Sequence, residues 1–156
     1  MKIRLLAVGQ KMPKWVQQTF NDYNNRLSKN QQLELVEIVP VHRSKTMNVD
    51  KAKQMEGNSI IAALKPNEKI IVLDERGKAI STKFLAQSIR TWQMDAFNIA
   101  IIVGGADGVS EKVKSKAYHL WSLSQLTFPH PLVRVILMEQ IYRAYSLIAN
   151  HPYHRE

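Results

Sequence analysis

The sequence predicts an α/β fold, with a parallel sheet covered by helices on both faces. Apolar, β-branched runs that fit buried strands alternate along the chain with longer segments of helical periodicity. This alternation indicates βαβ units, which place parallel strands side by side beneath helices. The chain of 156 residues contains no internal repeat, low-complexity tract or linker, so we expect one domain spanning residues 1–156.

The first half of the chain contains three predicted strands and two predicted helices. Gly9 ends the first strand, and Pro13 suits the start of the first helix. A polar, basic loop over residues 41–48 precedes the second helix. Gly57 lies inside this helix, where glycine is unfavourable. The predicted strands are 2–9, 33–39 and 69–74, and the helices are 13–27 and 50–64. In the first helix the predicted inward residues are Trp15, Val16, Thr19, Phe20, Tyr23 and Leu27. In the second helix they are Ala52, Met55, Ser59, Ile60, Ala63 and Leu64.

The second half begins with a predicted turn at Arg76-Gly77-Lys78. Ser81 and Ser110 each suit the N-cap of a helix, and Asn150 fits a left-handed helix end. The predicted elements are a helix after Ser81, a strand at 98–103, a short helix at 110–118, a strand at 120–126 and a helix at 131–150.

The last predicted helix is apolar over most of its circumference. Such a helix lies either in the middle of a core or against a second subunit. Because the sheet of this small domain is already covered, we favour a dimer interface, with a buried core helix as the alternative. One side carries Leu132, Val135, Ile136, Glu139, Tyr142 and Arg143, and another carries Val133, Leu137, Ile141, Ala144, Leu147 and Ile148.

Charge and composition restrict the possible functions. Lys and Arg number 22 against 13 Asp and Glu, a net charge of +9 that favours polyanions; a basic surface without a specific partner is the alternative. The lack of cysteine excludes disulfides and thiolate catalysis and is compatible with a reducing cytoplasm. No histidine pair has metal-ligand spacing, and no apolar run could span a bilayer. We therefore expect a cytoplasmic protein with neither a metal nor a membrane segment.

A glycine-rich turn follows the predicted strand 98–103. Gly104, Gly105 and Gly108 lie where a strand gives way to a helix, the position at which open α/β sheets bind ligands. Their spacing matches neither the dinucleotide fingerprint nor a P-loop. A tight strand-to-helix turn also needs glycine for conformational reasons alone, so this motif is weak by itself.

Two further segments predict a binding pocket with a reactive partner beside it. In residues 121–131, serines alternate with leucines before Pro-His-Pro, so Leu123 and Leu126 could form an apolar wall beside backbone amides. The alternative is an ordinary strand and a proline-stiffened turn. The final six residues, His-Pro-Tyr-His-Arg-Glu, concentrate titratable and aromatic groups, although a frayed terminus is the alternative.

These motifs together resemble the RlmH family of bacterial SPOUT methyltransferases, which methylate N3 of a pseudouridine in 23S rRNA. The resemblance covers the whole chain, and its closing stretch is long and unusual. It rests on residues 7–9, 11–13, 15–16 and 73–74, on Gly104, Gly105 and Gly108, and on 121–124, 126–127, 129–135, 142–144 and 150–156.

The resemblance implies a C-terminal trefoil knot that binds S-adenosyl-L-methionine in a bent conformation. It also implies a homodimer whose active site combines both subunits. The cofactor-binding positions that it implies are Leu73, Gly104, Leu123, Ser124, Gln125, Leu126, Thr127 and Phe128.

Methyl transfer to N3 requires alignment of the nitrogen with the methyl carbon and removal of the N3 proton. We favour His154 as the acceptor, with Tyr153 against the base and Arg155 on phosphate or a developing oxyanion. Glu139, His130 and the terminal carboxylates are alternative acceptors. Arg134 and Arg143 could act near the pocket or simply form ion pairs.

We therefore expect a methyltransferase that modifies 23S rRNA on the assembled 70S ribosome. The side chains of His42, Arg43 and Lys45 suit contacts with the RNA backbone. A SPOUT methyltransferase for another RNA, such as tRNA, is one alternative. A ribosome-binding protein without catalytic activity is the other.

Overall fold

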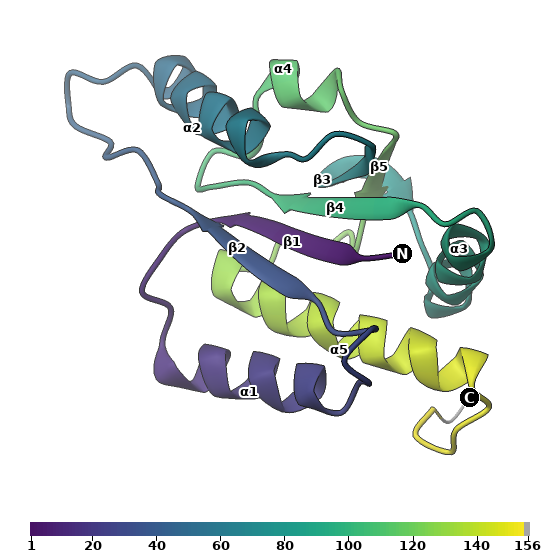
Figure 1. Ribbon diagram of the computed structural model, residues 1–156. Helices are drawn as coiled ribbons and strands as arrows, with labels where there is room; N and C mark the ends of the chain where they lie inside the picture. The colour runs from purple at the N-terminus through teal and green to yellow at the C-terminus, as the bar shows by residue number, and fades with distance from the viewer. Residues whose placement is uncertain (155–156) are drawn as a thin grey trace.

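A computed structural model of the protein describes residues 1–154 and contains a five-stranded sheet in the order β2-β1-β4-β3-β5 (Figure 1). Every neighbouring pair of strands is parallel, as the sequence predicts. The elements are β1 Ile3–Val8, α1 Lys14–Asn25, β2 Glu34–Ile38, α2 Val49–Ala63, β3 Glu68–Ala79, α3 Thr82–Met94, β4 Asn98–Val103, α4 Glu111–Lys114, β5 His119–Ser122 and α5 His130–Ile148.

Helices cover both faces of the sheet. Consecutive strand residues point to opposite faces, and apolar residues on each face are buried by helices. Leu5 and Ile101 belong to a core with α1, α3 and α5, whereas Leu6 and Ile102 belong to a core with α2 and α4. Figure 1 shows α1 and α5 below the sheet and α2 and α4 above it. The two-sided arrangement is therefore confirmed, and the trefoil knot stays a prediction.

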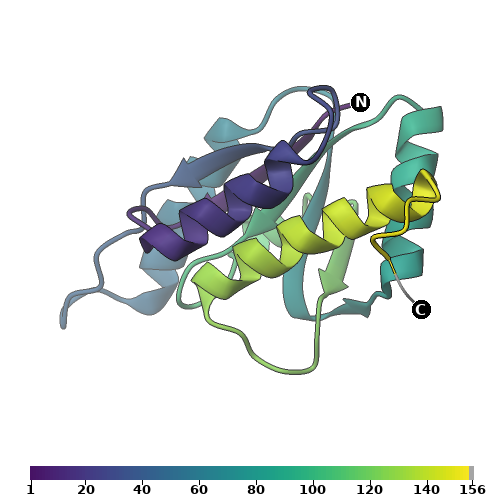
Figure 2. The same cartoon turned by 90° about the horizontal axis from the view of Figure 1, so that it is seen from below.

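Helix α5 lies across the sheet between α1 and α3 (Figure 2). Leu137, Met138 and Ile141 are fully buried in the core that it shares with them. The outer side of α5 is only half-buried, at residues such as Leu132 and Ile136. The core-helix alternative thus describes one side of α5, and the dimer interface predicted for this helix stays a prediction.

Helix caps follow the prediction. The Ser81 hydroxyl accepts a hydrogen bond from the Phe84 N–H at 3.1 Å, and the Ser110 hydroxyl accepts one from Val113 at 3.4 Å. Asn150 follows α5 at φ 54°, the left-handed conformation expected of it. Among the described helices, none is both long and apolar enough to cross a membrane.

Strand β3 does not end where the sequence predicts. The expected turn at residues 76–78 is wrong, because β3 continues to Ala79. After a register shift, Lys78 and Ala79 pair with Trp121 and Ser122 of β5. Gly77 allows this close pairing, since a Cβ there would lie 2.6 Å from the carbonyl carbon of Leu120.

Two shorter elements also differ from the prediction. The short helix α4 ends at Lys114 rather than Tyr118, and β5 ends at Ser122 rather than Leu126. The chain leaves the sheet after Ser122 because Ser124 forms local hydrogen bonds: its carbonyl accepts from Ser122 and its hydroxyl from the Leu126 N–H.

Three residues predicted to face inward are exposed instead. Trp15 is 51% exposed, and Met55 and Ser59 lie on the outer side of α2. Glu56 and Gly57 take the buried positions of α2. A Cβ at Gly57 would collide with the Ser110 hydroxyl, so this glycine permits the close approach of α4.

A buried ion pair joins β1 to the start of β3. Arg4 Nε and Nη2 donate to the two carboxylate oxygens of Glu68 at 2.6 and 2.8 Å, and the side chains are only 5% and 4% exposed. Arg4 also donates to the Ala63 carbonyl, and Glu68 accepts from the Lys65 N–H. The pair thereby fixes the end of α2 against the sheet.

Candidate active site

A pocket of about 690 Å³ opens at the carboxyl ends of β3, β4 and β5. Three segments surround it: residues 74–76 within β3, the glycine loop (residues 104–108) after β4, and the loop of residues 123–129 before α5. The carboxyl edge of a parallel sheet is where α/β folds bind ligands, and the volume suits a small molecule. Charged lining residues are Lys53, Asp74, Glu75, Arg76, Asp107, Glu111 and Lys114.

The glycine loop is closely packed on itself. The Gly108 N–H donates to the Gly105 carbonyl at 3.0 Å, and Gly108 adopts φ +83°. A Cβ at Gly104 would lie 2.7 Å from the backbone carbon of Gly108 and 2.6 Å from the side chain of Val109. Gly104 is therefore required by the turn itself, and it also lines the pocket.

Replacing Gly104 by alanine should push the glycine loop out of place. We expect about tenfold weaker binding of S-adenosyl-L-methionine in calorimetry, equivalent to about 1.4 kcal/mol. As a control, Gly108→Asn adds a side chain where no atom lies within 4 Å, at a positive φ that asparagine tolerates. The control should unfold thermally close to wild type. Unchanged affinity in Gly104→Ala would exclude the glycine loop from the donor site.

Most residues predicted to bind the cofactor lie around this one pocket. Residues 123–128 form a loop rather than the predicted strand, and this loop is one wall of the pocket. Gln125 is the exception, since its side chain is exposed and is not among the lining residues. The predicted residues that line the pocket are Leu73, Gly104, Leu123, Ser124, Leu126, Thr127 and Phe128.

An ion pair that sequence reasoning missed forms part of the wall. Lys114 Nζ lies 2.8 Å from Asp74 Oδ2, linking α4 to β3. Burial acts to raise the pKa of Asp74, but the hydrogen bonds from Lys114 and from the Arg76 N–H outweigh it and lower the pKa. Asp74 is therefore ionised at neutral pH. The sequence offered one signal for a functional role of Asp74, which is its position directly after the apolar residues 70–73 of a buried strand.

His130 opens α5 at the rim of the pocket. Burial, and then the charge of Arg134, lower the pKa of this histidine. The imidazole is therefore neutral at neutral pH and keeps one nitrogen able to accept a proton.

Both arginines of α5 form contacts within the chain. Arg134 is 2% exposed, and it donates to Glu37 Oε2 at 2.7 Å and to the Gly9 carbonyl at 2.9 Å. Arg143 donates to Glu139 at 2.6 Å. Neither arginine lines the pocket, so the ion-pair alternative describes both.

The C-terminal tail follows the end of α5 (Figure 2), whereas the pocket lies beside the start of this helix, at His130. The Tyr153 hydroxyl donates to Glu139 Oε1 at 3.1 Å, and its ring packs edge-on against Tyr142 at 4.6 Å. His154 has a buried Nδ1 without a hydrogen-bond partner. Arg155, the third predicted catalytic residue, lies outside the described residues.

The length of α5 separates the tail from the pocket of the same subunit. The helix has 19 residues, and at 1.5 Å per residue it spans about 28 Å. His130 belongs to the pocket end, whereas Tyr153 and His154 follow the other end. The fold of a single chain therefore does not bring its predicted cofactor residues and its predicted catalytic residues together.

The three residues predicted to contact the RNA backbone all belong to the basic loop. His42 and Lys45 are exposed on the basic loop (residues 41–48), while Arg43 is held by acidic side chains of the same chain. Within residues 1–154, no three His, Asp or Glu side chains are grouped so as to hold a metal ion.

A parallel sheet flanked by helices, with a pocket at its carboxyl edge, is the arrangement in which α/β proteins bind small organic ligands. The family model described as "Predicted SPOUT methyltransferase" matches residues 1–154. The chain belongs to the SPOUT methyltransferase family.

Two relatives resemble this chain over its full length. A relative from Marinomonas sp. (strain MWYL1) is 48% identical over 155 residues, covering 99% of this chain and all of the relative. A second, from Acinetobacter baylyi, is 47% identical over 158 residues, covering 99% of each chain. Both are named ribosomal RNA large subunit methyltransferase H.

Solved structures show the same fold at low identity. A methylase family protein from Neisseria gonorrhoeae has a TM-score of 0.59 at 10% identity, covering 99% of this chain and 86% of that one. Another from Haemophilus influenzae Rd KW20 has a TM-score of 0.56 at 11% identity, covering 99% and 70%.

Proposed function

We propose that this SPOUT methyltransferase transfers a methyl group from S-adenosyl-L-methionine to N3 of a pseudouridine in 23S rRNA. The observation that carries the proposal is full-length identity of 48% to a relative named as an rRNA large subunit methyltransferase. We further propose that it acts as a homodimer on the assembled 70S ribosome in the cytoplasm. The net charge of +9 supports a nucleic-acid substrate.

The pocket has the chemistry that the methyl donor needs. Leu123, Phe128 and Val133 provide an apolar wall for the adenine ring, and the backbone of the surrounding loops offers hydrogen bonds to its edge. Glu75 supplies negative charge for a ligand that carries a sulfonium and an ammonium group, whereas the charge of Asp74 is balanced by Lys114. When bound, the donor supplies an activated methyl group for in-line displacement.

The tail reaches a donor pocket only if it comes from a second subunit. Within one subunit, Tyr153 is held at the far end of α5 by Glu139 and Tyr142. The half-buried outer side of α5 offers a surface on which two copies could pack. We therefore assign the pocket to one subunit and Tyr153, His154 and Arg155 to its partner.

In this arrangement the tail residues handle the nucleobase. His154 accepts the N3 proton, Tyr153 orients the base, and Arg155 binds phosphate or the developing oxyanion. Glu139 already accepts hydrogen bonds from Arg143 and Tyr153, which suits it to holding the tail. His130, neutral at the pocket rim, is the second candidate for the proton.

Labelled donor tests the proposal directly. Ribosomes from a strain without the modification are incubated with the protein and radioactive S-adenosyl-L-methionine, and the labelled nucleotide is mapped by mass spectrometry. We expect label on N3 of one pseudouridine in 23S rRNA, and more on 70S particles than on naked RNA. Label in tRNA would favour the other SPOUT activity. Ribosome binding without label in any RNA would favour a role without catalysis.

A further inference from the structure

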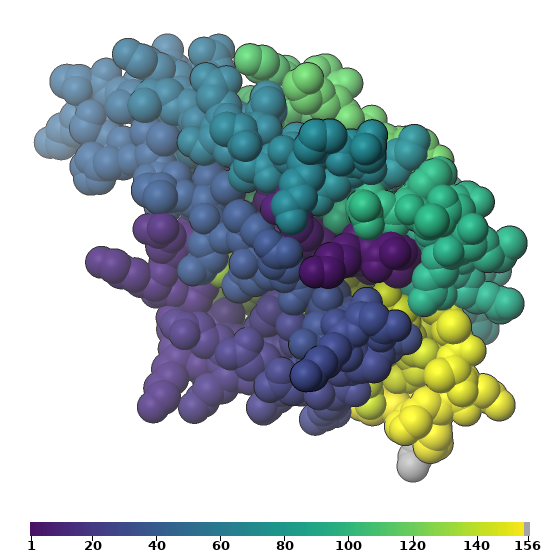
Figure 3. Space-filling view, in the orientation of Figure 1, coloured from purple at the N-terminus to yellow at the C-terminus, as the bar shows by residue number. Residues whose placement is uncertain are grey.

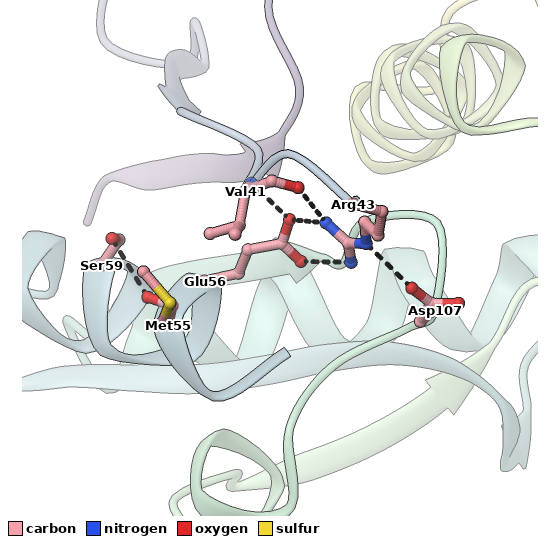
Figure 4. Close-up of polar contacts among 6 residues, drawn as sticks. All are labelled: Val41, Arg43, Met55, Glu56, Ser59 and Asp107. Carbon is pink, nitrogen blue, oxygen red and sulfur yellow. Dashed lines mark hydrogen bonds and ion pairs between the residues drawn. The ribbon is translucent and has the colours of Figure 1, made fainter. Parts of the chain in front are cut away.

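A cluster of charged groups joins the basic loop to the glycine loop (Figure 4). At its centre is Glu56 of α2, which is only 2% exposed. Its carboxylate accepts from the Val41 N–H at 2.9 Å and from both terminal nitrogens of Arg43. Arg43 Nε donates in turn to Asp107 Oδ2 at 3.0 Å, and Nη1 also donates to the Val41 carbonyl.

These contacts leave Arg43 unsuited to the role that the sequence predicts for it. Four of the five N–H groups of its guanidinium already donate to acceptors of this chain, which leaves one N–H group for an RNA phosphate. Its hydrogen bonds to Glu56 hold the pKa of Arg43 above its ordinary value, so the group stays charged. The guanidinium of Arg43 therefore joins the basic loop to α2 and to the glycine loop.

The two segments that Arg43 joins face different ligands of the proposed reaction. Asp107 belongs to the glycine loop and lines the donor pocket, with 33% of its side chain exposed. The basic loop carries the exposed residues His42 and Lys45, and it projects from the body of the molecule together with the start of α2 (Figure 3). Glu56 accepts a hydrogen bond from the basic loop at Val41 and also lies close to the glycine loop, since a Cβ added to Gly105 would lie 3.0 Å from Glu56 Oε1.

Resting on the proposed function, we propose that Arg43 is a positioning residue that couples the donor pocket to the RNA-facing basic loop through Asp107. A donor in the pocket restricts the glycine loop, and the Asp107–Arg43–Val41 contacts transmit that restriction to the basic loop. Because such coupling is reciprocal, rRNA held by the basic loop also tightens donor binding.

Hydrogen exchange of the basic loop tests this coupling without measuring activity. In the wild-type protein, saturating S-adenosyl-L-methionine should slow amide exchange over residues 41–48 by about fivefold or more. Asp107→Asn keeps the Arg43–Glu56 pair but removes the charged link, and it should abolish this slowing at a donor concentration that still saturates the pocket. Asp95→Asn, an equal change at an exposed site after α3, should behave as wild type.

A double-mutant cycle separates coupling from direct contact between Asp107 and the donor. Arg43→Lys keeps the charge but cannot bridge two carboxylates, and should weaken donor binding in calorimetry by about fivefold. If Asp107 acts through Arg43, adding Asp107→Asn to Arg43→Lys should weaken binding no further than Asp107→Asn alone. If the double variant instead loses donor affinity by the product of the two single-variant losses, the two residues act independently and the coupling is overturned.

Two results distinguish this inference from the proposed function. Donor binding by the wild-type protein with no change in exchange over residues 41–48 would overturn the coupling alone. Failure of the wild-type protein to bind S-adenosyl-L-methionine would overturn the proposed function, and the coupling with it.

Discussion

Deletion of residues 153–156 is expected to abolish methyl transfer to rRNA while S-adenosyl-L-methionine still binds. The tail lies at the far end of α5 from the pocket of its own subunit, so its loss should not disturb the donor site. Loss of base positioning and proton removal together should lower the rate by about a thousandfold or more. Calorimetry with the donor and label incorporation into ribosomes measure the two effects separately.

Mixed dimers provide the matching control. At a donor concentration well below saturation, the Gly104→Ala protein alone should retain about a tenth of wild-type activity. Co-expression with tail-deleted subunits should raise this activity, because one chain supplies the pocket and the other supplies the tail. Random pairing makes half of the dimers mixed, each with one complete site of two, so activity should reach about a quarter of wild type. Loss of donor affinity in the tail deletion, or no recovery on mixing, would contradict the two-subunit site.

Replacing Arg4 by methionine is expected to cost about 3–5 kcal/mol of unfolding free energy, because it leaves a buried carboxylate without its counter-ion. Glu68 is 4% exposed at its side chain and loses two of its hydrogen bonds in this variant. Urea denaturation at neutral pH measures the change. The double variant Arg4→Met/Glu68→Leu should recover most of the loss, and an Arg4→Met protein as stable as wild type would refute the argument.

The same pair predicts how acid affects stability. Burial acts to raise the pKa of Glu68, but the hydrogen bonds from Arg4 and from the Lys65 N–H outweigh it, so the folded pKa lies below the ordinary value. The pair therefore stabilises the protein above about pH 4.3, the ordinary glutamate pKa, and this contribution is lost as pH falls through the lower folded pKa. In Arg4→Met, protonation relieves the unpaired charge, so the stability gap to wild type should narrow in acid.

The strands and caps could be predicted because their signals are local. Residues 98–103 are apolar enough to require burial on both faces, and the Ser81 and Ser110 hydroxyls cap helices that begin beside them. The end of β3 could not be predicted in this way. Gly77 and its charged neighbours resemble a turn, but distant β5 pairs with them and extends the strand.

Buried charged residues were the second reason why the sequence-based predictions differ from the structure. Periodicity placed Met55 inward on α2, yet the neighbouring Glu56 is buried because Arg43 of another segment neutralises it. In the candidate site, the resemblance identified the glycine loop and the loop before α5, whereas the Asp74–Lys114 and Arg43–Asp107 pairs were not found. Each joins residues that meet only after folding, so no short sequence pattern records it.

The two outer strands have a consequence for how this protein meets other copies of itself. β2 and β5 have five and four residues, and β2 carries Glu34 and Glu37 along its exposed length. Short edge strands, and edge strands that carry charge, are poor templates for strand addition. The apolar interior strands are thereby shielded from cross-β aggregation, and any self-association is directed away from the sheet and onto helices.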